Sequence, residues 1–96
     1  MEQIKRITQM ERALDESAAA LEELEAALER YDTVQTDLAA LSDYYKSPLW
    51  RKDYADDEAG KLPKNLKRGV LSQDTVYNLL MEHDQLRQWM RELSRD

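Results

Sequence analysis

The densest group of potential metal ligands in this sequence is Asp53, Asp56, Asp57 and Glu58. An EF-hand calcium loop needs acceptors at positions 1, 3 and 5, glycine at position 6 and glutamate at position 12. A loop starting at Asp53 would place Ala55 at position 3 and Glu58 at position 6, so the template fails. Capping or pairing with nearby basic residues is the favoured role, and a loose divalent-cation site is the alternative.

Side chains that could serve catalysis are sparse. His83 is the only histidine and the chain has no cysteine, so a cysteine nucleophile and the usual zinc ligand set are both excluded. Ser72 has no histidine or lysine arrangement that would activate it, and a helix-capping role explains it. We therefore expect no enzymatic activity, no bound metal and no cofactor.

One basic cluster stands out, formed by Lys61, Lys64, Lys67 and Arg68. The Gly-Lys pair at its start is followed by leucine rather than serine or threonine, so it is not a Walker phosphate loop. Three interpretations remain open. The cluster pairs with the acidic first half of the chain, binds an acidic protein surface, or binds an anion or nucleic acid.

Two aromatic residues precede this cluster. Trp50 and Tyr54 are four residues apart, which places them on one face of a short helix. They either dock that helix onto the rest of the fold or anchor a partner, because tryptophan and tyrosine dominate binding hot spots. With Lys61, Lys67 and Arg68 they form the candidate partner-binding set, since this segment is the least generic part of the chain.

Composition limits the possible classes of protein. The chain has 96 residues, enough for one small domain, and a net charge of −6. Residues 1–45 hold eleven of the 20 acidic residues and only four of the 14 basic ones, which disfavours a nucleic-acid partner. No apolar run approaches the roughly 18 residues that span a bilayer, and Met1 is followed by no signal-peptide pattern. We expect a cytoplasmic protein without membrane contact.

The first half of the chain predicts one long helix over residues 2–46. Its apolar residues follow the three-and-four spacing of a single helical face. They are Ile4, Ile7, Met10, Leu14, Ala18, Leu21, Leu24, Leu28, Tyr31, Val34, Leu38, Leu41 and Tyr45. The double short step at 28–31–34 is a coiled-coil stammer. It predicts a bend near 31–34. Alternatively, Asp32 and Gln35 resemble a capping box among weak helix formers, which would give a break at this point and a three-helix bundle.

Capping residues divide the second half. Ser47-Pro48 ends the long helix and starts a short helix over 48–56, with Gly60 as its terminator. An ordered connector over 57–71 leads to a last helix over 73–94, with Ser72 as N-cap and Leu71 and Val76 as a hydrophobic staple. The predicted fold is one all-α domain over residues 1–96, with the last helix packed back antiparallel as a helical hairpin or three-helix bundle.

The helix lengths predict self-association. A helix of about 45 residues is ~67 Å long, and the last helix covers only about half of that length. The uncovered apolar face would be an interaction patch. We therefore expect a homodimer, with a three-helix monomer as the alternative. The residues expected to mediate pairing are Ile7, Met10, Leu14, Leu21 and Leu24.

The segment over residues 47–80 resembles a bacterial family known as domain-of-unknown-function family 4298. The resemblance is carried by Trp50, Asp53-Tyr54, Asp56-Asp57-Glu58, Gly60, Leu62-Pro63, Leu66-Lys67-Arg68-Gly69-Val70-Leu71-Ser72, Asp74 and Tyr77. It implies a bacterial cytoplasmic protein and brings no activity, ligand or catalytic residue. The favoured function is a non-catalytic protein–protein interaction module. The alternative is anion or nucleic-acid binding through residues 61–68.

Overall fold

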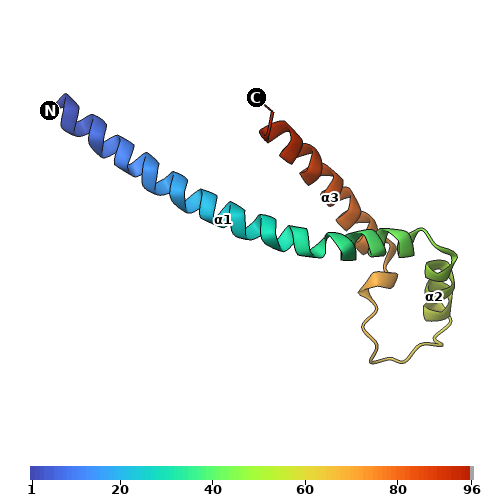
Figure 1. The fold of residues 1–96 in the computed structure, drawn as a ribbon. Helices are drawn as coiled ribbons and strands as arrows, with labels where there is room; N and C mark the ends of the chain where they lie inside the picture. The colour runs from blue at the N-terminus through green and yellow to red at the C-terminus, as the bar shows by residue number, and fades with distance from the viewer. Residues whose placement is uncertain (96) are drawn as a thin grey trace. The chain divides into compact units, whose positions relative to one another are not determined.

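The computed structural model describes residues 1–95, and its regular secondary structure is entirely helical. In chain order, α1 spans Glu2–Tyr45, α2 spans Pro48–Glu58, the 3₁₀ helix η1 spans Gly69–Leu71 and α3 spans Gln73–Leu93 (Figure 1). The predicted all-α class with a long first helix is confirmed. None of the described helices has an apolar stretch long enough to cross a membrane.

α1 continues without interruption through residues 31–34. No glycine or proline lies there to stop the backbone ladder. Thr33 is a weak helix former, and its hydroxyl donates to the carbonyl of Arg30 at 2.7 Å. The side chain therefore bonds back within α1 and does not cap the start of a new helix. The alternative prediction of a break at this point, with a three-helix bundle as its result, is therefore wrong.

By internal contacts the chain divides into two compact units, Met1–Thr36 and the described chain from Asp37 onward. The first unit has no core of its own, because α1 contains no buried residue. The buried apolar residues of the described chain are Trp50, Leu71 and Val76, all in the second unit. The structure thus confines the small core to the second unit, and the single domain over residues 1–96 stays a prediction.

Ser47 links the end of α1 to the start of α2, as predicted. Its hydroxyl accepts a hydrogen bond from the amide of Trp50 at 3.3 Å and donates to the carbonyl of Tyr44 at 2.7 Å. Pro48 occupies the first turn of α2, where a missing N–H costs no hydrogen bond. One hydroxyl thus satisfies backbone groups of both helix ends, which places Trp50 in the first turn of α2.

α2 ends in a Schellman motif centred on Gly60. The amide of Lys61 donates to the carbonyl of Asp56 at 2.9 Å, and the amide of Gly60 donates to the carbonyl of Asp57 at 3.0 Å. Gly60 has a φ of 73°, the left-handed conformation that glycine adopts at no steric cost. The predicted terminator is confirmed, although α2 extends to Glu58, two residues past the predicted end.

The connector from Ala59 to Ser72 begins as a loop after α2 and includes η1 just before α3 begins (Figure 1). Leu71 and Val76, the predicted staple, are both buried, with 6% and 2% of their surface exposed. Ser72 occupies the N-cap position of α3, but its side chain makes no capping hydrogen bond, so that part of the prediction is wrong. Its backbone amide instead closes η1 by donating to the carbonyl of Gly69 at 3.1 Å.

Within the second unit, η1 joins α2 to α3, because it contacts both of these helices. Three residues of chain therefore carry the packing between two helices, and the buried side chain of Leu71 lies at this junction. The antiparallel packing of the last helix against the long helix stays a prediction.

Candidate interaction surfaces

An aromatic cluster centred on Trp50 holds α2 in place. The Trp50 ring stacks on Tyr54, with centroids 5.2 Å apart and an interplanar angle of 18°. Its edge meets the ring of Tyr45, with centroids 5.1 Å apart at 71°. Both geometries suit the quadrupoles of aromatic rings. The end of α1 and the start of α2 are therefore clamped around one indole.

The Trp50 indole also reaches the far end of the connector. Its Nε1–H donates to the carbonyl of Val70 in η1 at 2.9 Å. Because the indole is 6% exposed, this bond satisfies a donor that would otherwise be buried without a partner. One side chain thus fixes the positions of α1, α2 and η1 in the second unit.

Burial favours one of the two predicted roles of the aromatic pair, docking of the short helix, while the role as a partner anchor stays a prediction. Trp50 is buried and Tyr54 is half-buried against it, so neither ring offers much free area to another protein. The alternative interpretation, docking of the short helix onto the fold, describes what they do. Tyr45 and Val70 complete this cluster and were not predicted as site residues. Tyr45 belongs to the apolar face of the first helix, but no spacing rule links Trp50 to a carbonyl twenty residues later.

Tyr44 and Asp53 form a second link between α1 and α2. The Tyr44 hydroxyl donates to Asp53 Oδ2 at 2.6 Å. Burial of the phenol, the hydrogen bond to Asp53 and the negative charge of that carboxylate together raise the pKa of Tyr44 to about 12. All three favour the protonated phenol, because a phenolate would lie directly against a carboxylate.

Replacement of Asp53 by asparagine is expected to lower the pKa of Tyr44, since the amide carries no charge. The folded protein holds the Tyr44 proton above the pH at which the unfolded chain loses it. This link therefore stabilises the fold fully below about pH 10, and its contribution is lost as the pH rises toward about 12. A spectrophotometric titration should show that Tyr44 loses its proton at a lower pH in Asp53→Asn than in the parent chain, although burial of the phenol still raises its pKa in the variant. An unchanged midpoint for Tyr44 in Asp53→Asn would contradict this role of Asp53.

The basic cluster splits into one engaged residue and three exposed ones. The guanidinium of Arg68 is half-buried, pairs through Nη1 with Asp57 Oδ1 and donates through Nη2 to the carbonyl of Lys64 at 3.1 Å. Lys61, Lys64 and Lys67 have exposed side chains. Arg68 therefore pairs with α2 rather than with the acidic long helix, and its two recorded partners lie within the second unit.

The predicted acidic cluster does not gather around one point. Asp53 accepts from Tyr44, Asp56 pairs with Lys52 at 2.9 Å, and Asp57 pairs with Arg68. The hydrogen bond from Lys52 lowers the pKa of the Asp56 carboxyl, and the same bond raises the pKa of Lys52. These pairs support the favoured interpretation of capping and pairing. Among the described residues, no group of three candidate ligands could hold a metal ion.

An open hollow of about 380 Å³ lies between the end of α2 and the start of α3. Its wall carries the carboxylates of Asp57, Glu58 and Asp74 beside Arg68. Three acidic residues thus line this hollow together with one guanidinium that Asp57 already engages, so an anion would meet net repulsion here. The positive end of the α3 dipole does not offset that charge, because a helix terminus contributes only about half an elementary charge.

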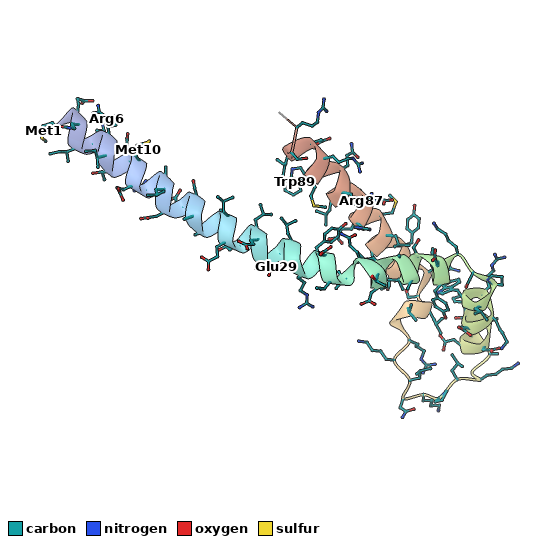
Figure 2. All side chains as sticks on the ribbon, viewed as in Figure 1. Met1, Arg6, Met10, Glu29, Arg87 and Trp89 are labelled. Carbon is teal, nitrogen blue, oxygen red and sulfur yellow. The ribbon has the colours of Figure 1, made fainter. Side chains whose placement is uncertain are left out.

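The residues predicted to mediate self-association form an exposed apolar face in the first unit, which we call the α1 face. Their exposed fractions are 52% for Ile7, 60% for Met10, 62% for Leu14, 64% for Leu21 and 52% for Leu24. Figure 2 labels Met10 and its neighbour Arg6 on this part of α1. The structure therefore keeps all five side chains accessible, as a docking face requires.

Comparison with known proteins identifies a family but no function. A family described as "Domain of unknown function (DUF4298)" matches residues 7–93, and the chain belongs to this family. The resemblance inferred from the middle of the sequence is thereby confirmed, and it extends over both units. No curated protein and no solved structure matches the chain.

Proposed function

We propose that this member of the family is a non-catalytic protein–protein interaction module of the bacterial cytoplasm, and that the α1 face is its docking element. The observation that carries the proposal is the exposure of five large apolar side chains at helical spacing, each more than half accessible. Contiguous apolar patches are rare on soluble proteins and mark sites where another surface binds.

The physics of helices supports the same conclusion. An unpacked helix is marginally stable in water, and most helical stability in proteins comes from packing of an apolar face. The first unit contains no buried residue that could supply such packing. A helix-in-groove or helix-on-helix contact would supply it, with anchors at successive turns.

Titratable groups in the described chain support a non-catalytic role. The pKa shifts resolved are those of Tyr44, Lys52 and Asp56. The shift of Tyr44 follows from burial and its contact with Asp53, and the shifts of Lys52 and Asp56 follow mainly from their mutual pair. A catalytic site gathers such groups around a shared cavity, whereas these three belong to two separate contacts. The alternative of anion or nucleic-acid binding through residues 61–68 is weakened, because Arg68 is already engaged and acids lie beside it.

A photo-cross-linking amino acid tests the docking element. A benzophenone side chain in place of Leu14 is expected to give cross-linked protein products in the cells that produce the chain. The same group in place of Ala19, which lies on the opposite side of α1, should give at least about tenfold less product. Addition of Leu21→Glu should abolish the Leu14 product. Equal labelling from both positions, or no product from Leu14 in a helical chain, would show that this face is not a docking element.

A further inference from the structure

We infer that the occupant of the α1 face is a second copy of this chain, packed parallel and in register along residues 7–28. This inference rests on the proposed function, because it names the partner of the same face. Three features carry it: the register of the exposed apolar residues, one serine within that register, and the charges that flank it.

The exposed apolar residues fit one heptad frame. Ile7, Leu14, Leu21 and Leu28 are seven residues apart and take the a positions, while Met10, Ser17 and Leu24 take the d positions. A seven-residue apolar repeat is the pattern by which two similar helices pack knobs into holes. The frame spans three heptads, or about 33 Å of helix. Two identical faces can therefore cover each other along their whole length.

Ser17 distinguishes the two possible orientations. In a parallel pair, Ser17 meets Ser17 of the second copy, so both hydroxyls share one layer and can bond to each other. The antiparallel alternative has a register in which Met10 faces Leu28 and Leu14 faces Leu24. In this register each of the two Ser17 side chains faces Leu21 of the other copy, in two separate layers. A hydroxyl packed against leucine has no partner there. The parallel arrangement therefore confines the free-energy cost of burying hydroxyl groups to one layer. The pairing of serine with serine in that layer also fixes the register.

The charges beside the face favour the same orientation. Arg6 takes a g position and Glu11 the following e position, so a parallel pair brings opposite charges together twice. The antiparallel register instead places Glu11 beside Glu25 of the second copy. Each such pair changes an association constant by about two-fold. The flanking charges attract in the parallel pair and repel in the antiparallel pair, and each contact occurs twice by symmetry.

The remaining charges do not oppose this pairing. Asp15, Glu16, Glu22 and Glu23 take outer b and c positions, away from the seam, where salt screens them within a Debye length of about 8 Å. The other g positions are occupied by Ala13, Ala20 and Ala27, which carry no charge. The parallel seam therefore has one attractive charged pair on each side and brings no two like charges together.

The heptad frame ends where the exposure of α1 changes. After Leu28 the spacing shortens, and the next apolar residues, Tyr31 and Val34, leave the earlier frame. Their side chains are half-buried, as is that of Leu38, whereas every large apolar residue from Ile4 to Leu28 is exposed. The pairing segment is therefore the stretch before the stammer.

Single cysteines test the pairing, because the chain contains none of its own. A parallel pair sets each d position against itself, so Met10→Cys and Leu24→Cys should each oxidise to a disulfide-linked dimer of twice the 11.3 kDa chain mass. Ala19→Cys at the outer f position should react at least about tenfold more slowly. The antiparallel register would hold the two cysteines of Met10→Cys about 27 Å apart, beyond the reach of a disulfide. Light scattering on the unmodified chain gives the mass without any cross-link.

Each outcome decides the inference. A mass of two chains with both d-position cross-links supports it. A mixed disulfide between Met10→Cys and Leu28→Cys chains, without the two self cross-links, overturns the orientation. A single-chain mass at all concentrations, or a mass of three chains, overturns the pairing. If the benzophenone at position 14 still links the single chain to another protein, the proposed function stands and only the choice of a second copy fails.

Discussion

Replacement of Trp50 by alanine is expected to remove a large part of the stability of the second unit. Truncation of a buried tryptophan costs about 3–5 kcal/mol, and small domains have a total of only about 5–15 kcal/mol. Here the loss also removes the stack on Tyr54, the edge contact with Tyr45 and the hydrogen bond to Val70. Guanidinium denaturation followed by circular dichroism should show the folded baseline shortened or absent.

The chain offers a matched control in its second tryptophan. Trp89 on α3 is 58% exposed and is labelled in Figure 2. Its replacement by alanine should cost less than about 1 kcal/mol, as for most exposed positions. Trp50→Phe should fall between the two, because it keeps the aromatic packing but loses the donor to Val70, at about 1 kcal/mol. Equal midpoints for Trp50→Ala and Trp89→Ala would refute the role of Trp50 as the centre of the core.

Leu21→Glu is expected to reduce self-association by at least about a hundred-fold. In the parallel pair, position 21 is an a position, so two carboxylates would be buried facing each other. The effective penalty is several kcal/mol per buried ion. The mass by light scattering should fall to 11.3 kDa, and helicity should fall with it because the first unit loses its packing.

Ala19→Glu is the matched control for this effect. It adds the same charge to the same helix at an exposed outer position, so the mass should stay unchanged. Both variants should keep the denaturation midpoint of the second unit, which contains the core. If Leu21→Glu and the parent chain gave the same mass and the same helicity, the seam would lie elsewhere.

Most of the fold could be predicted from the sequence, because it depends on local signals. The cap at Ser47, the left-handed Gly60 and the burial of Leu71 and Val76 each follow from residue types a few positions apart. The continuity of α1 through residues 31–34 was harder to predict, because weak helix formers and a partial capping motif argued for a break. Without glycine or proline, the backbone ladder outweighed these preferences.

The candidate site was predicted only in part. The α1 face followed directly from periodicity, because the spacing of apolar residues along one helix decides which side chains share a face. The role of the Trp50 region did not, because it depends on contacts between residues far apart in sequence, such as the bonds from Trp50 to Val70 and from Arg68 to Asp57. Residue type alone could not distinguish an exposed aromatic anchor from a buried one.

The connector between α2 and η1 has a consequence for how the chain can change in length. Its C-terminal end is held to α2 by the Trp50 indole on Val70 and by Arg68 on Asp57, while the residues around Lys64 are exposed. Doubling the length of a flexible loop with fixed ends costs only about 0.6 kcal/mol. Insertions should therefore accumulate here among relatives, and an epitope or a fluorophore inserted beside Lys64 would report on the protein without altering either the aromatic cluster or the α1 face.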